Sequence, residues 1–202
     1  MSWRRALASR WPYFSVALII LVVDQTTKVL AHAYLRGSSA VPIVPGFFNL
    51  SYSRNRGGLF GYFGSLADPW RSVLLTVLPV VAIVLIAAFL VRSDVAHRTT
   101  RLGLASILGG AVGNLVDRVV RGEVVDFLDV YASMPRLADW LVRTFGTAHW
   151  PTFNVADSCI VIGAGLLILD MLRPEAQAAA VRGDDAASPA AEREPGRNGL
   201  GA

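Results

Sequence analysis

Four aspartates stand where the surrounding sequence is apolar enough to cross a membrane. Asp24 lies in WPYFSVALIILVVDQTTKVL, Asp117 in GGAVGNLVDRVV, Asp126 in GEVVDFLDVY and Asp157 in FNVADSCIVIGAGLLIL. A charged side chain at membrane depth costs at least about 2.5 kcal/mol, so such residues are rare and usually functional. Two carboxylates held together in a partly desolvated place share a proton. Such a pair can activate water against an amide, because one carboxylate takes the proton of the water and the other polarises the carbonyl group.

Helical spacing places further polar side chains beside three of these aspartates. The groups that share a helix face are Asn114 with Asp117 and Arg118, Asn154 with Asp157, and Asp24 with Lys28. Polar pairs inside a membrane also fix helix packing, and for Asp24 with Lys28 this structural interpretation is as good as a functional one. Asp126 and Asp157 have no basic residue at helical spacing, which favours a functional role for both.

The composition is that of a membrane protein. Of the 202 residues, 53% are hydrophobic and 17% are charged, whereas a soluble domain carries about 25% charged residues. The net charge of +4 is scattered along the chain, which excludes a nucleic-acid footprint. The one cysteine, Cys159, has no histidine near it in sequence and is expected to pack as a small apolar residue. Neither a metal nor another cofactor is expected, because no zinc-type spacing is present.

The aspartates must be positioned by apolar segments of about 20 residues, the length that spans a bilayer. Four segments qualify, at residues 11–30, 70–91, 102–120 and 155–172. The loop 36–69 contains a strand-like stretch, residues 47–52, and predicts a small β-rich unit on the outer surface. We therefore expect an α-helical membrane protein with four transmembrane helices in residues 1–172. Residues 173–202 are polar and of low complexity, which predicts a disordered cytoplasmic tail.

Basic residues near the first span predict its orientation. Arg4, Arg5 and Arg10 place the amino terminus inside, and four spans then place both termini in the cytoplasm. A signal peptide is the alternative, but Asp24 and Lys28 separate the apolar run from the small-residue triplet that follows it, so we favour an uncleaved span. In a four-span topology all four aspartates lie at the same, outer side of the membrane.

Several of these residues stand in motifs known from one protein family. The motifs are Asp24-Gln25 with Lys28, Asn55-x-Gly57 with Phe60, Gly113-Asn114-Leu115-x-Asp117-Arg118, Gly122 with Val124-Val125-Asp126-Phe127, and Phe153-Asn154-x-Ala156-Asp157-Ser158. Over residues 12–172 the chain thus resembles the bacterial lipoprotein signal peptidase (signal peptidase II) family.

The resemblance implies an intramembrane aspartic endopeptidase of the bacterial inner membrane. It implies that the substrate is a diacylglyceryl-modified prolipoprotein, cleaved just before the lipidated cysteine, and that Asp126 and Asp157 are the catalytic pair. Eight supporting or substrate-binding positions follow from the same motifs, namely Asp24, Lys28, Asn55, Gly57, Asn114, Asp117, Arg118 and Asn154. The expected partners are this substrate and membrane lipid, with the enzyme a monomer.

The chain departs from the family pattern in two places. Gly58-Leu59 stands where the family has Ala-Ala, and the stretch between Asp126 and Asp157 is longer, with an insertion at residues 132–150. Within the insertion, four apolar residues lie near one face at helical spacing, namely Leu137, Trp140, Leu141 and Phe145. This pattern predicts a short interfacial helix. Two hypotheses stay open for it: a lid over the active site, or a surface insertion with no part in catalysis.

Two rival function classes explain part of the pattern. A proton-coupled transporter also carries intramembrane acids, but it predicts acids spread through the membrane depth and internal repeats. An assembly factor that docks helices through Gly109-x-x-x-Gly113 is the second rival, and that motif is common. The gathering of the acids at one side favours the peptidase.

Overall fold

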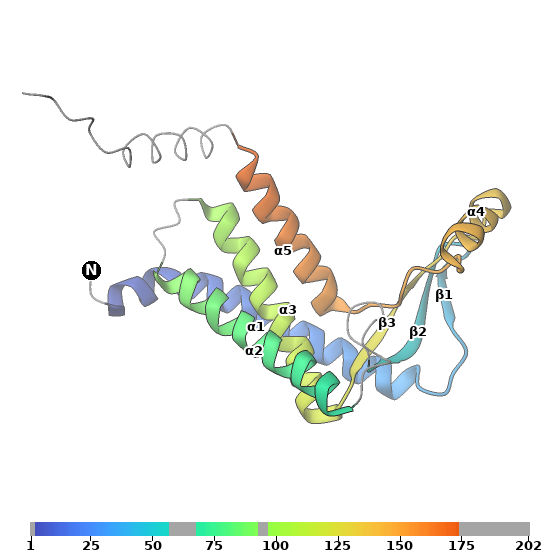
Figure 1. The fold of residues 1–202 in the computed structure, drawn as a ribbon, viewed down its shortest axis with the longest axis horizontal. Helices are drawn as coiled ribbons and strands as arrows, with labels where there is room; N and C mark the ends of the chain where they lie inside the picture. The colour runs from blue at the N-terminus through green and yellow to red at the C-terminus, as the bar shows by residue number, and fades with distance from the viewer. Residues whose placement is uncertain (1–2, 57–67, 93–96, 174–202) are drawn as a thin grey trace, which may run out of the picture.

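The computed structural model describes residues 3–56, 68–92 and 97–173 and is mainly helical (Figure 1). In chain order the elements are α1 (Trp3–Tyr34), β1 (Val41–Val44), β2 (Phe48–Asn55), α2 (Asp68–Arg92), α3 (Arg98–Arg121), β3 (Val124–Val130), α4 (Pro135–Phe145) and α5 (Val155–Met171). Gly57, Phe60 and the tail from residue 174 onward, all named in the sequence predictions, lie outside the described residues.

Three helices in the described part of the chain are long and apolar enough to cross a membrane. They are Arg10–Tyr34 of α1, Val73–Arg92 of α2 and Arg98–Arg121 of α3. The helix α5, where the fourth span was predicted, has 17 residues, fewer than the roughly 20 that cross a bilayer. The prediction of a helical membrane protein is confirmed, and the fourth span stays a prediction.

Helix α3 is the centre of the bundle and contacts α1, α2 and α5. A Cβ atom on Gly103 would lie 2.8 Å from the carbonyl oxygen of Gly163, and one on Gly163 would lie 2.6 Å from that of Gly103. On the other side of α3, a Cβ on Gly109 would lie 2.7 Å from the carbonyl oxygen of Ala17 in α1. Small residues at these crossings let the helix backbones touch, so Gly109 serves packing within this chain.

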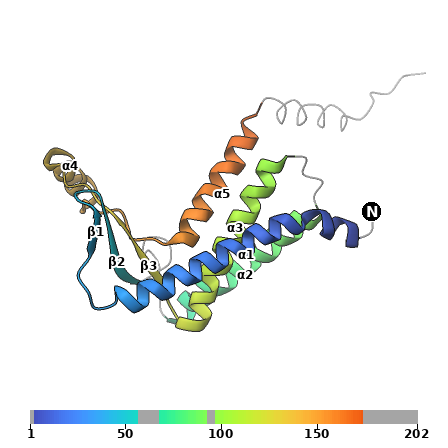
Figure 2. The same cartoon turned by 180° about the vertical axis from the view of Figure 1, so that it is seen from behind.

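A three-stranded antiparallel sheet in the order β1-β2-β3 extends from the end of the bundle where α1 and α3 end and α5 begins (Figures 1 and 2). Strand β2 contains most of the stretch predicted as strand-like, and it pairs with β3 so that Ser53 lies opposite Asp126. The prediction of a small β-rich unit is confirmed. The sequence reasoning did not predict β3.

The turn from α3 to β3 brings the end of the helix close to the start of the strand. Gly122 ends α3 with a φ of 75°, a left-handed conformation that glycine adopts without strain, and its N–H donates to the carbonyl of Arg118 at 3.1 Å. Strand β3 begins two residues later, and its Val125 and Phe127 pack with Ala31 of α1. The strand is thereby fixed to the ends of both helices.

Candidate active site

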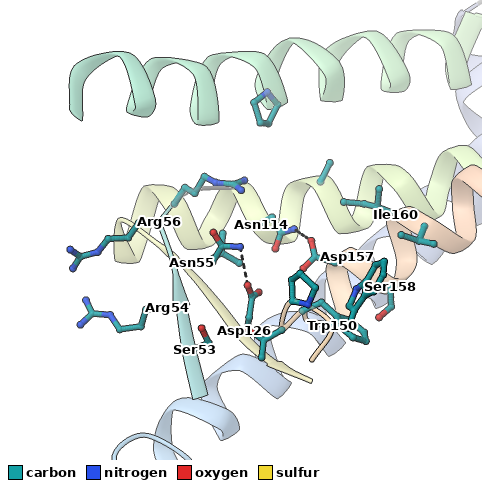
Figure 3. A pocket seen from close by; sticks show the side chains of 18 of the residues that line it. Ser53, Arg54, Asn55, Arg56, Asn114, Asp126, Trp150, Asp157, Ser158 and Ile160 are labelled. Carbon is teal, nitrogen blue, oxygen red and sulfur yellow. Dashed lines mark hydrogen bonds between the residues drawn. The ribbon is translucent and has the colours of Figure 1, made fainter. Parts of the chain in front are cut away.

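Asp126 and Asp157 line one cavity of about 910 Å³ at the junction of the bundle and the sheet. Figure 3 shows both carboxyl groups pointing toward this cavity, with Asn55 and Asn114 beside them. Arg118 of α3 also lines it. Pro79 of α2, Ala111 of α3, and Ile160, Val161 and Ile162 of α5 add apolar lining. The cavity therefore combines a polar end that holds two carboxyl groups with an apolar wall.

Asn154 links the two carboxyl groups. Its side-chain Nδ2 donates to Asp126 Oδ1 at 2.6 Å, and its Oδ1 accepts from the backbone N–H of Asp157 at 3.0 Å. In return, Asp157 Oδ2 accepts from the backbone N–H of Asn154 at 3.3 Å, so the two residues form a capping box at the start of α5. The same local geometry that starts the helix thus positions Asp157 relative to Asp126.

Two further side-chain amides each donate a hydrogen bond to one carboxyl group of the pair. Asn55, at the end of β2, donates from Nδ2 to Asp126 Oδ2 at 3.0 Å, and Asn114 of α3 donates from Nδ2 to Asp157 Oδ1 at 2.7 Å (Figure 3). Each carboxyl group therefore receives hydrogen bonds from neutral amides, which hold it in place without requiring it to be ionised.

The surroundings of Asp126 favour its protonated form. Burial raises the pKa of Asp126 from 3.8 to about 6, and the nearby carboxylate of Asp157 adds to the rise. The hydrogen bonds from Asn55 and Asn154 and the charge of Lys28 oppose the rise and do not cancel it. A carboxyl group with a pKa near 6 can take up or release a proton close to neutral pH, as a general acid or base must.

A buried network built on Lys28 lies behind the pair. The ammonium of Lys28 is fully buried and contacts Asp24 Oδ2 at 2.9 Å and Asp117 Oδ2 at 3.0 Å, and it donates to Asn114 Oδ1 at 2.9 Å. Arg121 forms a further ion pair with Asp117. The predicted contact between Asp24 and Lys28 is confirmed, and Lys28 reaches the site through Asn114.

The two carboxylates of this network also accept hydrogen bonds from the backbone of α5 and β3. Asp24 Oδ1 accepts from the N–H of Ala156 at 2.9 Å, at the start of α5. Asp117 Oδ2 accepts from the N–H of Val125 at 3.2 Å, in β3. Ala156 directly precedes Asp157 in α5, and Val125 directly precedes Asp126 in β3. Each of the two bonds therefore holds the backbone next to one member of the pair. All four aspartates are thus brought together, as the sequence predicted.

Sequence reasoning missed the ion pairs that join the ends of β2 and β3. Glu123 pairs with Arg54, and also with Arg56 at 2.9 Å. Burial alone would raise the pKa of Glu123, but hydrogen bonds from Arg54 and Arg56 outweigh it and lower the pKa. In the sequence, Glu123 shows only as an acid that follows a predicted span, and this position does not reveal which residues it pairs with. These pairs stabilise the strand ends that carry Asn55 and Asp126.

The insertion at residues 132–150 contributes to the site through its last residue, Trp150, and through the segment that follows it, not through its helix. The segment 150–153 returns to β3, with the N–H of Trp150 donating to the carbonyl of Val130 at 2.8 Å, and it lines the cavity. The expected helix is present as α4, but none of its residues lines the cavity, and it stands at the far end of the sheet (Figure 1). In this structure α4 therefore does not cover the pair, and the lid stays a hypothesis.

Comparisons with known proteins agree on one family. The family model described as signal peptidase (SPase) II matches residues 16–173. A lipoprotein signal peptidase of Solibacter usitatus is 41% identical over 172 residues, which cover 85% of this chain and 97% of the relative. One of Paraburkholderia phymatum is 42% identical over 166 residues, covering 80% of this chain and 88% of the relative.

Solved structures share the fold. A bacterial membrane enzyme determined by the in meso method at 1.9 Å resolution superposes with a TM-score of 0.66 and 24% sequence identity, covering 81% of this chain and 94% of the other. A second, at 2.3 Å resolution, gives a TM-score of 0.63 at 22% identity and covers 91% of this chain. At these identities the likeness concerns the fold alone.

Proposed function

The chain belongs to the signal peptidase II family, and we propose that it cleaves by an aspartic mechanism in which Asp126 and Asp157 are the catalytic pair. The observation that carries the proposal is the link through Asn154, which binds one carboxyl group with its side chain and shares a capping box with the other. Both groups face one cavity large enough for a peptide segment. The proposed substrate is a diacylglyceryl-modified prolipoprotein, cleaved before its lipidated cysteine.

The proposed reaction begins with one carboxyl group ionised and the other protonated. The ionised group takes a proton from a water molecule, and the resulting hydroxide attacks the carbonyl carbon of the scissile peptide. The protonated group donates its proton to the carbonyl oxygen, so that charge does not accumulate there. When the tetrahedral diol collapses, the C–N bond breaks as the leaving nitrogen takes a proton from one carboxyl group of the pair. A hydroxyl of the diol returns its proton to the other carboxyl group, so the pair again holds one proton, as at the start. Asn55, Asn114 and Asn154 keep the carboxyl groups in position throughout.

The apolar wall suits a substrate that carries lipid. Pro79 of α2 and Ile160 and Val161 of α5 line the cavity, and Val161 is also exposed. We infer that the diacylglyceryl group approaches sideways from the bilayer between α2 and α5, with the peptide reaching the carboxyl pair from the same side. Such a route keeps the acyl chains in an apolar environment until cleavage.

This function requires the carboxyl pair to lie near one membrane surface. We propose that α5 is the fourth span, tilted little because it has only 17 residues. Both termini then lie in the cytoplasm and the sheet lies outside the inner membrane of the bacterium. The enzyme is proposed to act as a monomer, since both carboxyl groups come from one chain.

The test is cleavage of a diacylglyceryl-modified prolipoprotein by the purified protein in detergent, followed by the mobility shift of the product. Asp126→Asn and Asp157→Asn should each abolish cleavage, and the double variant should be no worse than either, because the two groups act as one unit. Substantial turnover by either single variant would contradict the assignment of the pair.

A further inference from the structure

Helix α4 is a well-formed helix whose apolar side has no cover among the described residues. Pro135 occupies its first turn, and Gly146 ends it with a φ of 80° and an N–H that donates to the carbonyl of Val142 at 2.8 Å. No residue of α4 is buried. Trp140 is 56% exposed and Phe145 is 67% exposed. Large side chains of this kind, gathered on one surface element, mark an interaction site.

Four of the apolar residues of α4 gather on one face, and Val142 lies outside it. Leu137, Trp140, Leu141 and Phe145 follow helical spacing, while Arg136, Asp139 and Arg143 occupy the opposite face. Trp140 and Phe145 also contact each other edge to face, with ring centroids 5.9 Å apart. This arrangement of aromatic and aliphatic side chains opposite arginines is that of helices that lie in a membrane surface.

The position of α4 puts the helix within reach of lipid. In both views the sheet does not continue the axes of α1, α3 or α5 but turns away sideways from their ends, with α4 at its free end (Figures 1 and 2). If the long helices cross the bilayer, the sheet runs along the bilayer surface and α4 lies beside the bundle at the level of its outer end. The tryptophan belongs at that level, where an amphipathic ring is favoured.

The segments that flank α4 are bonded to each other and to β3, so the position of the helix bears on the active site. Ala132 N–H donates to the carbonyl of Ala148 at 3.0 Å and closes the base of the insertion. His149 Nδ1 lies 2.8 Å from Asp129 Oδ1 in β3, and its ring stacks on that of Tyr131. The next residues, 150–153, line the cavity that holds the carboxyl pair. Holding α4 therefore holds one wall of the cavity.

We propose that α4 is a membrane anchor that inserts its apolar face among the lipids of the outer leaflet and fixes the free end of the sheet on the bilayer surface. The occupant of the face is phospholipid: the apolar side chains meet the acyl chains, and Arg136 and Arg143 reach the phosphates from the polar face. The anchor keeps the wall at residues 150–153 at the depth where a lipid-modified substrate lies. The proposal rests on the proposed placement of the long helices across the membrane.

The single cysteine makes a direct test possible. In a Cys159→Ala background, Leu141→Cys and Asp139→Cys place an environment-sensitive fluorophore on the apolar and the polar face of α4 respectively. The full chain is reconstituted in nanodiscs of phosphatidylcholine and phosphatidylglycerol. We expect blue-shifted emission at position 141 that brominated phosphatidylcholine quenches several-fold more strongly than emission at position 139.

Three outcomes would overturn the anchor. Equal quenching by a water-soluble quencher at both positions would mean that the face lies in water. A blue shift at position 141 without quenching by brominated lipid would mean that protein covers the face. Disulfide-linked dimers of the Leu141→Cys variant would identify a second copy as the occupant. Because none of these readouts needs cleavage, a failed anchor and a failed peptidase assignment are distinguishable.

A cleavage assay complements the fluorescence measurement. Replacing Trp140 and Leu141 together with Ser removes the centre of the apolar face and leaves the four long helices untouched. We expect several-fold slower processing in proteoliposomes and a much smaller effect in detergent, where no bilayer surface needs to be matched. Processing at the normal rate in proteoliposomes would contradict a role for the anchor in presenting the substrate.

Discussion

Asp126→Asn should abolish cleavage and at the same time stabilise the folded protein above pH 6. Asp126 is 1% exposed and receives hydrogen bonds from Asn55 and Asn154. Burial and the neighbouring Asp157 raise its pKa from 3.8 to about 6. Ionisation of this carboxyl group in the folded protein therefore lowers the free energy of unfolding. An isosteric amide in its place does not ionise and does not cause this loss.

The magnitude follows from the pKa. One pKa unit corresponds to about 1.4 kcal/mol, so the rise from 3.8 to about 6 corresponds to about 3 kcal/mol. Because the folded state binds the proton more tightly than the unfolded state, stability falls as the pH rises from about 4 to about 6 and stays low above that. The Asp126→Asn variant avoids this loss of stability. Its free energy of unfolding therefore exceeds that of the wild type increasingly over the same pH range.

The amide has a cost of its own. Asn55 and Asn154 both donate to the carboxyl group, whereas an Asn at position 126 offers only one acceptor oxygen. One hydrogen bond is lost or must be rearranged, at about 1 kcal/mol. The expected net gain is about 2 kcal/mol above pH 6, which corresponds to a rise in the melting temperature of roughly 4–8 °C for a chain of this size.

Thermal unfolding in detergent at pH 4 and pH 7.5, followed by tryptophan fluorescence, measures this difference. A matched control is Asp129→Asn on the same strand, because Asp129 is also buried but accepts from His149 and Asn49 and lies away from the pair. The control should not gain stability at pH 7.5. A fall in the melting temperature of Asp126→Asn at pH 7.5, or an equal gain at both pH values, would refute the reasoning.

The remaining predictions concern the framework. Lys28→Met leaves two buried carboxylates without their ammonium partner and should cost about 3–5 kcal/mol, seen as a large drop in melting temperature; an unchanged melting temperature would contradict the network. Gly110→Ala adds a Cβ that collides with the carbonyl of Ala156 and should lower both melting temperature and cleavage, whereas Gly165→Ala meets nothing within 4 Å and should change neither. Cys159→Ala should cleave at the normal rate, and loss of activity would argue for a thiol mechanism.

The helices and the first ion pair were predictable because their signals are local. An apolar run of about 20 residues shows itself without knowledge of its neighbours, and Asp24 with Lys28 is an i, i+4 pair that any helix brings together. The gathering of the aspartates needed only the alternating direction of the spans. Lys28 also contacts Asp117 and Asn114 of α3, and that depends on how α1 and α3 are rotated and how closely they approach.

Strand β3 and the location of α4 were less accessible for different reasons. The residues of β3, Val124–Val130, are apolar at five of seven positions and buried at five, and their pattern lacks the alternation that identifies a strand. Helix α4 has clear amphipathic spacing, but spacing does not say where a helix stands. Its place at the free end of the sheet is determined by the pairing of β3 with β2 and by the return of residues 148–153.

The partners of the four aspartates separate their roles. Asp24 and Asp117 are paired with the ammonium of Lys28, and Asp117 also with Arg121, so these two carboxylates contact cations. Asp126 and Asp157 receive their hydrogen bonds from amides.

An amide orients a carboxyl group whether or not it carries a proton, whereas a cation at 3 Å favours only the charged form. In the proposed mechanism the pair exchanges a proton during each turnover, and amides beside it suit both of its protonation states. The ammonium of Lys28 reaches the pair through Asn114, and Arg118 lines the same cavity. On this reasoning Asn114→Asp, which would replace an amide with a third carboxylate next to Asp157, should stop cleavage even though the side chain keeps its size. Cleavage at the normal rate by that variant would show that the neutrality of these partners does not matter.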